Sequence, residues 1–310
     1  MDRPTLRQLE YAVAVARLCS FSRAAEQLHV SQPALSAQIA ELERRLGVVL
    51  FERTRTATSP TPAGREVLAR ARDLLRDADD LLRAAETHRG TIAGVLRVGA
   101  IPTVAPYLLS TVARQMHRLW PDVQLELSEA RTTELVTSVA AGRVDVGLLA
   151  TPVDTGTLIV ADLAFEPFVV AVADTNRMAA RRRLRVDELG GLEVLLLEDG
   201  HCLRGHALTV CDLAGVANRR DVHGAGLAVL AQMVAASDAA TLLPAGAVPV
   251  EARPGAGLAT VGLAEGDVGR TLSLVWRAGD PRADLYDRAV PRLAAAVQQA
   301  LQVRPSGRAG

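Results

Sequence analysis

Residues 21–54 read FSRAAEQLHVSQPALSAQIAELERRLGVVLFERT, and this stretch decides the fold of the N-terminal region. It predicts two short helices, over 23–29 and from Ser31 to a stop at Gly47, with a tight turn at Val30. Ser31 can cap the second helix, and Pro33 falls in its first turn, where proline is tolerated. Apolar residues repeat on one face of that helix: Leu35, Ile39, Leu42 and Leu46. Two short helices joined in this way are typical of a helix-turn-helix.

The flanking sequence completes this N-terminal region. Residues 5–17 have the apolar period of a helix, and residues 48–61, VVLFERTRTATSPT, predict a two-stranded wing. One long helix is predicted from Pro62 to about Arg89. Its apolar positions form a seam: Leu68, Leu74, Leu75, Ala78, Leu81, Leu82 and Ala85. An otherwise polar helix needs something to pack on such a seam, so we expect it to pair with a second copy of the chain.

Beyond a linker at 90–94, apolar strand runs alternate with helices, which predicts a parallel α/β sheet covered on both faces. The predicted strands are 95–101, 123–130, 144–150, 168–174, 193–199, 240–246 and 270–276; the predicted helices are 106–119, 132–141, 225–236 and 281–301. About 210 residues suit two Rossmann-like subdomains, the arrangement of periplasmic binding proteins. The predicted domains are therefore a winged helix-turn-helix (1–61), a linker and dimerisation helix (62–91), a regulatory domain (92–303) and a flexible tail (304–310). We place the two regulatory subdomains at about 92–164 with 268–303, and at 165–267.

Charge and cysteine content narrow the class of protein. The 310 residues carry no net charge, and all 35 basic residues are Arg. Residues 1–72 hold 11 Arg against 7 acidic residues, a net charge of +4, which suits a nucleic-acid-binding module. No apolar run is long enough to span a bilayer, and the N-terminus lacks the features of a signal peptide, so we expect a cytoplasmic protein without membrane contact. Three cysteines in a cytoplasmic chain do not suggest a structural disulfide framework, and they raise the question of reactive thiols.

Residues 5–64 resemble the LysR-type transcriptional regulators at nearly every position. The resemblance implies a DNA-binding regulator, not an enzyme, that acts on double-stranded operator DNA with RNA polymerase as a further partner. It places Ser31, Gln32, Pro33 and Ser36 at the major groove, where Gln32 can pair with adenine and Ser36 can hold phosphate. Arg53 and Arg55 on the wing would reach the DNA backbone or the minor groove. One departure is Ala37, where many relatives have Arg, and it leaves the operator sequence open.

A second informative string is LEDGHCLRGHALTVC, residues 197–211. Cys202 sits between His201 and Arg204, with His206 close by, and a positive neighbour favours the reactive thiolate. Eight residues separate Cys202 from Cys211. If residues 203–211 are helical, the two Cα atoms lie about 13 Å apart on opposite faces. A disulfide needs them within about 7 Å, so bonding would require the segment to unravel.

The same region resembles the peroxide-sensing members of the LysR family. The resemblance is carried by IPTVAPYLL (101–109), LEDGHCLR (197–204), LLPAGAVP (242–249) and Arg270-Thr271. It implies that hydrogen peroxide oxidises Cys202 to a sulfenic acid and that Cys211 completes a disulfide, which a cellular thiol reductant resets. The supporting roles it implies are peroxide binding by Thr103 with Thr132, orientation by His201, and stabilisation of negative charge by Arg204 and Arg270. It also implies control of antioxidant genes by a dimer or tetramer. Residues 225 and 226 depart from the pattern, because relatives have Thr or Ser there.

Three other functions stay open at this point. A regulator of the same architecture could bind a small metabolite in the cleft between its subdomains. His201, Cys202, His206 and Cys211 could hold zinc, although their spacing fits no standard motif. A thiol peroxidase is the third. We expect no metal and no cofactor, and we interpret Cys19 as a small buried core residue. His29, His88, His117 and the run 181–183 are expected to be surface residues without a special role.

Overall fold

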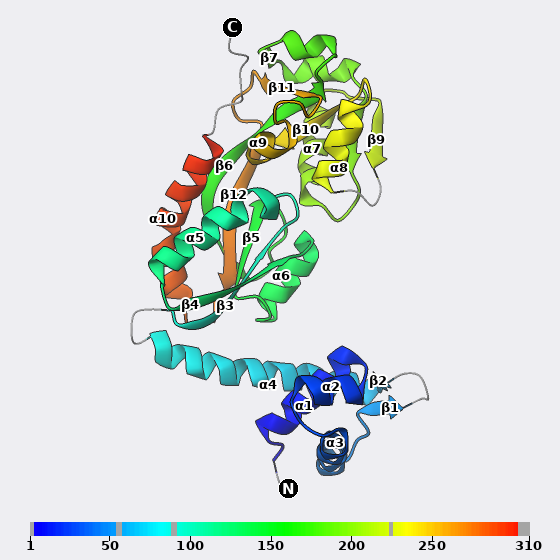
Figure 1. Ribbon diagram of the computed structural model, residues 1–310, viewed down its shortest axis with the longest axis vertical. Helices are drawn as coiled ribbons and strands as arrows, with labels where there is room; N and C mark the ends of the chain where they lie inside the picture. The colour runs from blue at the N-terminus through cyan, green and yellow to red at the C-terminus, as the bar shows by residue number, and fades with distance from the viewer. Residues whose placement is uncertain (1–2, 54–57, 88–91, 223–225, 303–310) are drawn as a thin grey trace. The chain divides into compact units, whose positions relative to one another are not determined.

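The computed structural model describes residues 3–53, 58–87, 92–222 and 226–302 (Figure 1). The chain divides into two compact units, Met1–Ala85 and Glu86–Gly310, which are described separately below. In the described ranges, no helix is both long enough and apolar enough to cross a membrane. Several residues named above lie outside the described ranges: Arg55, His88, Ala225 and the tail 304–310.

The N-terminal unit is a three-helix fold with a short wing and a long final helix. Its elements are α1 (Leu6–Leu18), α2 (Phe21–Gln27), α3 (Gln32–Leu46), β1 (Phe51–Arg53), β2 (Thr58–Pro60) and α4 (Pro62–Thr87). Thr5, Ser20 and Ser31 cap the three helices with their side chains, as short hydroxyl residues do best. Gly47 ends α3 with φ +69°, a conformation that suits glycine. The winged helix-turn-helix prediction is therefore confirmed.

The apolar seam of α4 is only partly covered within this chain. Leu68 is fully buried in the same core as Leu35, Ile39 and Leu42 of α3. Further along the helix, side chains that continue the seam are exposed: Leu74 (54%), Leu81 (74%) and Leu82 (67%). Leucines placed in a row on one helix and left in solvent are the kind of surface that a partner helix covers.

The C-terminal unit is built on one mixed sheet of ten strands. The strands are β3 (Gly94–Ala100), β4 (Val123–Glu129), β5 (Val146–Thr151), β6 (Leu158–Ala173), β7 (Arg183–Leu184), β8 (Val194–Leu197), β9 (Arg219–Val222), β10 (Ala240–Pro244), β11 (Leu258–Leu263) and β12 (Gly269–Arg277). Their order is β4-β3-β5-β12-β6-β10-β8-β9, with β11 beside β6 and β7 beside β11. The α-helices are α5 (Ser110–Leu119), α6 (Thr132–Ala140), α7 (Cys202–Leu213), α8 (Leu227–Ala235), α9 (Val248–Glu251) and α10 (Ala283–Leu301). Short π or 3₁₀ turns occupy Ala105–Leu109, Arg177–Ala180, Val186–Gly191 and Ala245–Ala247.

The sheet is mixed, whereas the alternation of strands and helices predicted a parallel one. β3, β4 and β5 are parallel to one another, as are β8, β9 and β10, but β12 runs antiparallel to β5 and β6. β6 also pairs antiparallel with β10 and β11. The reason is that β6 and β12 carry the chain from one half of the unit to the other and back (Figure 1). The predicted strand 168–174 is the second part of this longer β6.

Two separate apolar cores lie along this sheet. The first core takes its buried residues from 92–164 and 272–297, and it includes Trp276 and Tyr286, whose rings meet edge to face. The second core takes them from 168–263. α10 runs beside β6 and belongs to the first core (Figure 1). The segment around Cys202 lies between the two cores, because its side chains contribute to both.

Candidate functional site

The start of α3 presents its polar side chains together. Ser31 accepts a hydrogen bond from the Ala34 amide (3.3 Å), so its hydroxyl serves as the helix cap. The Gln32 carboxamide donates from Nε2 to the Ser36 hydroxyl (3.0 Å), one turn further along. Gln32 and Pro33 are exposed and Ser36 is half-buried. The bond aims Gln32 outward and leaves its carbonyl oxygen and one N–H available, which are the two groups that pair with adenine.

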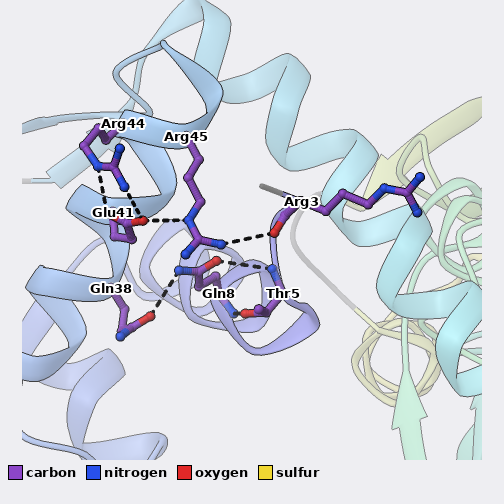
Figure 2. A network of polar contacts seen from close by, with 7 residues as sticks. All are labelled: Arg3, Thr5, Gln8, Gln38, Glu41, Arg44 and Arg45. Carbon is purple, nitrogen blue, oxygen red and sulfur yellow. Dashed lines mark hydrogen bonds and ion pairs between the residues drawn. The ribbon is translucent and has the colours of Figure 1, made fainter. Parts of the chain in front are cut away.

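A polar network fixes α3 against α1 (Figure 2). Gln8 is buried, donates to Gln38 of α3 (3.2 Å), and forms a reciprocal capping box with Thr5. Arg45 of α3 donates to the Arg3 carbonyl (3.2 Å) and to Glu41 (2.7 Å). Hydrogen bonds from Arg44 and Arg45 lower the pKa of Glu41. Sequence reasoning missed this network, although the spacing Thr5-x-x-Gln8 is a readable capping signature.

The wing consists of β1 and β2, paired antiparallel with Arg53 opposite Thr58. The described part of Arg53 is its backbone, at the end of β1. Arg55 lies outside the described residues. Contact of Arg53 and Arg55 with DNA therefore stays a prediction.

The second cluster is centred on α7, which begins at Cys202 and also contains Cys211. Both cysteines are free thiols; Cys202 is half-buried and Cys211 is fully buried. Cys202 packs on the first core and Cys211 lies inside the second. Nine helical steps turn through two and a half circles and rise about 13 Å, so the two side chains leave the helix on opposite faces. The helical geometry predicted from the sequence is thus present.

Cys202 lines an open pocket of about 550 Å³. The pocket brings together three residues singled out in the sequence: Thr132, His201 and Cys202. Its remaining wall comes from α6 and from the loop after β5, and it includes residues that sequence reasoning missed: Thr133, Val136, Thr137, Val153, Asp154, Gly156 and Gly200. Thr133 and Thr137 are four residues apart in α6 and so share one helix face, a spacing visible in the sequence TTELVT.

The positive charges near Cys202 are engaged elsewhere, contrary to the expectation drawn from the string. Arg204 forms ion pairs with Asp221 (2.7 Å) and Asp199 (3.3 Å), and the hydrogen bond to Asp221 raises the pKa of Arg204. Burial, and then the nearby Arg131, lower the pKa of His201, so this ring is neutral at pH 7. Cys202 is the first residue of α7. Sequence reasoning missed this position because it began the helix one residue later.

Thr103 and Arg270 form a buried cluster of their own. The Arg270 guanidinium donates to the Thr103 hydroxyl (2.8 Å) and to the Thr103 carbonyl (3.0 Å). Its Nε donates to Glu166 (2.8 Å), which also accepts from the Gly246 amide (2.9 Å). Thr103, Glu166 and Arg270 are each at most 2% exposed, and none of them lines the pocket around Cys202. Glu166 was missed, since nothing in the sequence around it separates a buried acid from an exposed one.

The prediction that Cys19 is buried is wrong, and the geometry of α7 argues against a zinc site that uses both Cys202 and Cys211. Cys19 is exposed, not buried, because it caps the C-terminus of α1 in a left-handed conformation (φ 49°) that turns it out of the core. A zinc ion needs its ligands within about 2.3 Å, and one ion cannot reach thiols on opposite faces of α7.

His29, His117 and residues 181–183 are exposed, as expected. Of the two departures from the family pattern, Gly226 precedes α8 and Ala225 lies outside the described residues.

Comparisons with known proteins assign both units of the chain to one family. Residues 6–65 match the family model "Bacterial regulatory helix-turn-helix protein, lysR family", and residues 89–302 match "LysR substrate binding domain". The chain is 38% identical over 283 residues to the DNA-binding transcriptional dual regulator OxyR of Escherichia coli (strain K12), covering 91% of this chain and 92% of that protein. A full-length cysteine variant of OxyR from Pseudomonas aeruginosa is similar in structure, with TM-score 0.77, 30% identity and full coverage of both chains. A hydrogen peroxide-bound cysteine variant of OxyR from Corynebacterium glutamicum has TM-score 0.66 and 33% identity, covering 97% of this chain and 94% of that one.

Proposed function

Since the chain belongs to the LysR family of bacterial transcription regulators, we propose that it senses hydrogen peroxide through Cys202 and Cys211 and switches antioxidant genes in response. In this proposal residues 1–61 read operator DNA in the cytoplasm, 62–91 pair two chains, and 92–303 form the sensor. The exposed leucines of α4 support pairing as a dimer or tetramer. RNA polymerase and a cellular thiol reductant are the further partners that the switch requires.

The chemistry has two balanced steps. The Cys202 thiolate attacks one oxygen of hydrogen peroxide, the O–O bond breaks, and hydroxide leaves and takes a proton to become water. The product is a sulfenic acid on Cys202. The Cys211 sulfur then attacks the Cys202 sulfur, the S–O bond breaks, and the Cys211 proton leaves with the hydroxyl group as a second water. Peroxide is reduced by two electrons, and two thiols become one disulfide.

The observation that carries the proposal is the separation of the two sulfurs by α7. Cys202 faces a pocket large enough for peroxide and water, whereas Cys211 is sealed in the second core. About 13 Å of helix must be unwound before the Cα atoms come within the roughly 7 Å that a disulfide allows. Oxidation therefore changes the fold between β8 and β9. In a pair of chains, this change would alter how the two DNA-binding domains bind DNA.

The test uses the full-length chain and its own operator. Peroxide-treated protein is digested and analysed by mass spectrometry for a disulfide between 202 and 211, and the DNA footprint is compared before and after treatment. We expect the disulfide and an altered footprint in the native chain, and neither in Cys202→Ser. Cys19→Ser is the matched control and should behave like the native chain. A native chain without this disulfide, and with an unchanged footprint, contradicts the proposal.

A second candidate is a regulator whose effector is a small metabolite held in the same pocket. The observation in its favour is the pocket itself, which has the volume of a ligand site and three threonines on its α6 wall. Such a protein would keep its response after Cys202→Ser, because its signal would not pass through the thiol. The Cys202→Ser footprint thus separates the two candidates.

A further inference from the structure

The turn that precedes Cys202 is held from the other half of the C-terminal unit. Arg131 lies between β4 and α6, among residues of the first core, whereas residues 198–200 follow β8 of the second core. The Arg131 guanidinium forms an ion pair with the Glu198 carboxylate and donates to the Asp199 carbonyl (3.4 Å). The two contacted residues are 67 and 68 positions after Arg131 in the sequence, and they lie four and three residues before Cys202.

Gly200 makes room for this contact. Its φ is +95°, a conformation that other residues rarely adopt, and a Cβ built there would lie 3.0 Å from the Arg131 Nη1 atom. The guanidinium therefore lies directly against the backbone of the turn. Any larger residue at 200 would push Arg131 away from the Asp199 carbonyl.

The position of this contact matters because one of the two thiols has to travel. Cys211 is fully buried in the second core, and an ion pair between Arg219 and Asp212 (2.7 Å) together with a bond from Arg219 to the Val216 carbonyl (2.7 Å) closes that end of α7. The Cys202 end is half-exposed and borders the open pocket. Cys202 is therefore the residue that leaves its place, and the turn 198–200 must come away from the first core with it.

We propose that Arg131 is a positioning residue that holds the turn 198–200 against the first core. It thereby delays the movement of Cys202 toward Cys211. This inference rests on the proposed function and adds a control point to its second step. The contact keeps Cys202 facing the pocket while peroxide reacts, and it has to break before the disulfide can form. It therefore sets the rate at which the sulfenic acid on Cys202 is converted into the disulfide.

The two steps can be measured separately in the full-length chain. In a Cys211→Ser background, a sulfenic-acid trapping reagent reports the rate of the first step alone. With both cysteines present, the mass shift of the disulfide reports the second step. We expect Arg131→Gln to raise the rate of disulfide formation about two- to fivefold, as fits the loss of a half-exposed ion pair, and to leave sulfenic-acid formation within about twofold of the native rate.

The matched control is Arg97→Gln, which removes another exposed ion pair of the first core, Arg97 with Glu126 (3.2 Å), far along the sequence from the turn. It should change neither rate. Glu198→Gln removes the same contact from the other side and should accelerate the second step in the same direction. The double variant Arg131→Gln/Glu198→Gln should be no faster than the faster single variant, because both remove one interaction.

A second readout depends on charge alone. Arg131 is one of the causes that lower the pKa of His201, so its removal should raise the midpoint of the His201 titration followed by NMR. Equal disulfide rates in Arg131→Gln and Arg97→Gln would overturn the inference, as would an additive double variant. A native chain that forms no disulfide at all would overturn the proposed function first, and the role of Arg131 with it.

Discussion

Cys202 and Cys211 leave α7 on opposite faces, and each thiol packs against a different core of the C-terminal unit. In the proposed function the helix therefore acts as a spacer between the thiol that peroxide oxidises and the thiol that completes the disulfide. While α7 is intact, the two Cα atoms are about 13 Å apart, farther than a disulfide allows.

The three cysteines should react with a thiol-alkylating reagent in a fixed order. Cys19 is exposed and Cys202 is half-buried, so both should be modified in the native chain before Cys211. Burial raises the pKa of the Cys211 thiol, which slows its reaction further at neutral pH. Peptide mass spectrometry over a time course checks the order, and urea should remove the differences. Early modification of Cys211 in the native chain would mean that α7 does not protect it.

Gly205→Ala should make the switch easier to reduce. Gly205 lies inside α7, and a Cβ there would meet no atom within 4 Å. Alanine in a helix interior is favoured over glycine by about 0.5–1 kcal/mol, so the substitution stabilises the helical thiol form. Because 1.4 kcal/mol corresponds to about 30 mV for two electrons, the midpoint potential should rise by roughly 10–20 mV in a glutathione titration. Gly191→Ala, at an open position outside α7, is the control and should leave the potential unchanged.

Gln32 and Arg53 should affect DNA binding in different ways. Gln32 is exposed and oriented by Ser36, so Gln32→Ala should reduce discrimination between operator and mismatched DNA by about 1–3 kcal/mol. Arg53→Ala should weaken binding to all sequences and lower the slope of affinity against salt by about one. Fluorescence anisotropy at several salt concentrations measures both. Arg182→Ala, a charge removed from the C-terminal unit, should change neither quantity.

Acidification should destabilise the C-terminal unit through two histidines. Burial is the main cause that lowers the pKa of both His201 and His206. The unfolded chain then binds more protons than the folded chain once the pH falls below about 6.5, so stability is lost from there toward the folded pKa values. Urea unfolding at pH 7.5 and 5.5 should show this loss, and His201→Gln/His206→Gln should reduce it. If the double variant loses as much stability between pH 7.5 and 5.5 as the native chain, the loss comes from other groups.

Local signals in the sequence were enough to predict most elements. Helix caps such as Ser31 and Gly47, and the apolar period of α3, are properties of neighbouring residues, and they fix the helix-turn-helix. The first part of β6 was missed because Asp162, Glu166 and Pro167 interrupt its apolar pattern. The direction of β6 and β12 was also missed, because strand pairing depends on partners about a hundred residues away.

The candidate site, too, could be predicted only where its features depend on neighbouring residues. The cysteine string and its helical spacing could be read directly, and the structure places Thr132, His201 and Cys202 around one pocket. The partners of the charged residues could not be read, since Glu166, Asp221 and Arg131 come from distant segments. Arg204 and Arg270, to which the resemblance assigned the stabilisation of negative charge, each have a carboxylate partner that the sequence did not reveal.

The path of β6 and β12 also bears on how the chain folds as it leaves the ribosome. The second core is built from one continuous stretch, 168–263, and is complete once that stretch has been synthesised. The first core begins at Ile92 but lacks Trp276, Tyr286 and the rest of its closing segment until the end of translation. The second core, whose first residues are made later, can thus be complete before the first core is. Until β12 is made, the side of β5 that faces it and residues 158–167 of β6 are unpaired strand edges that can cause a newly made chain to aggregate.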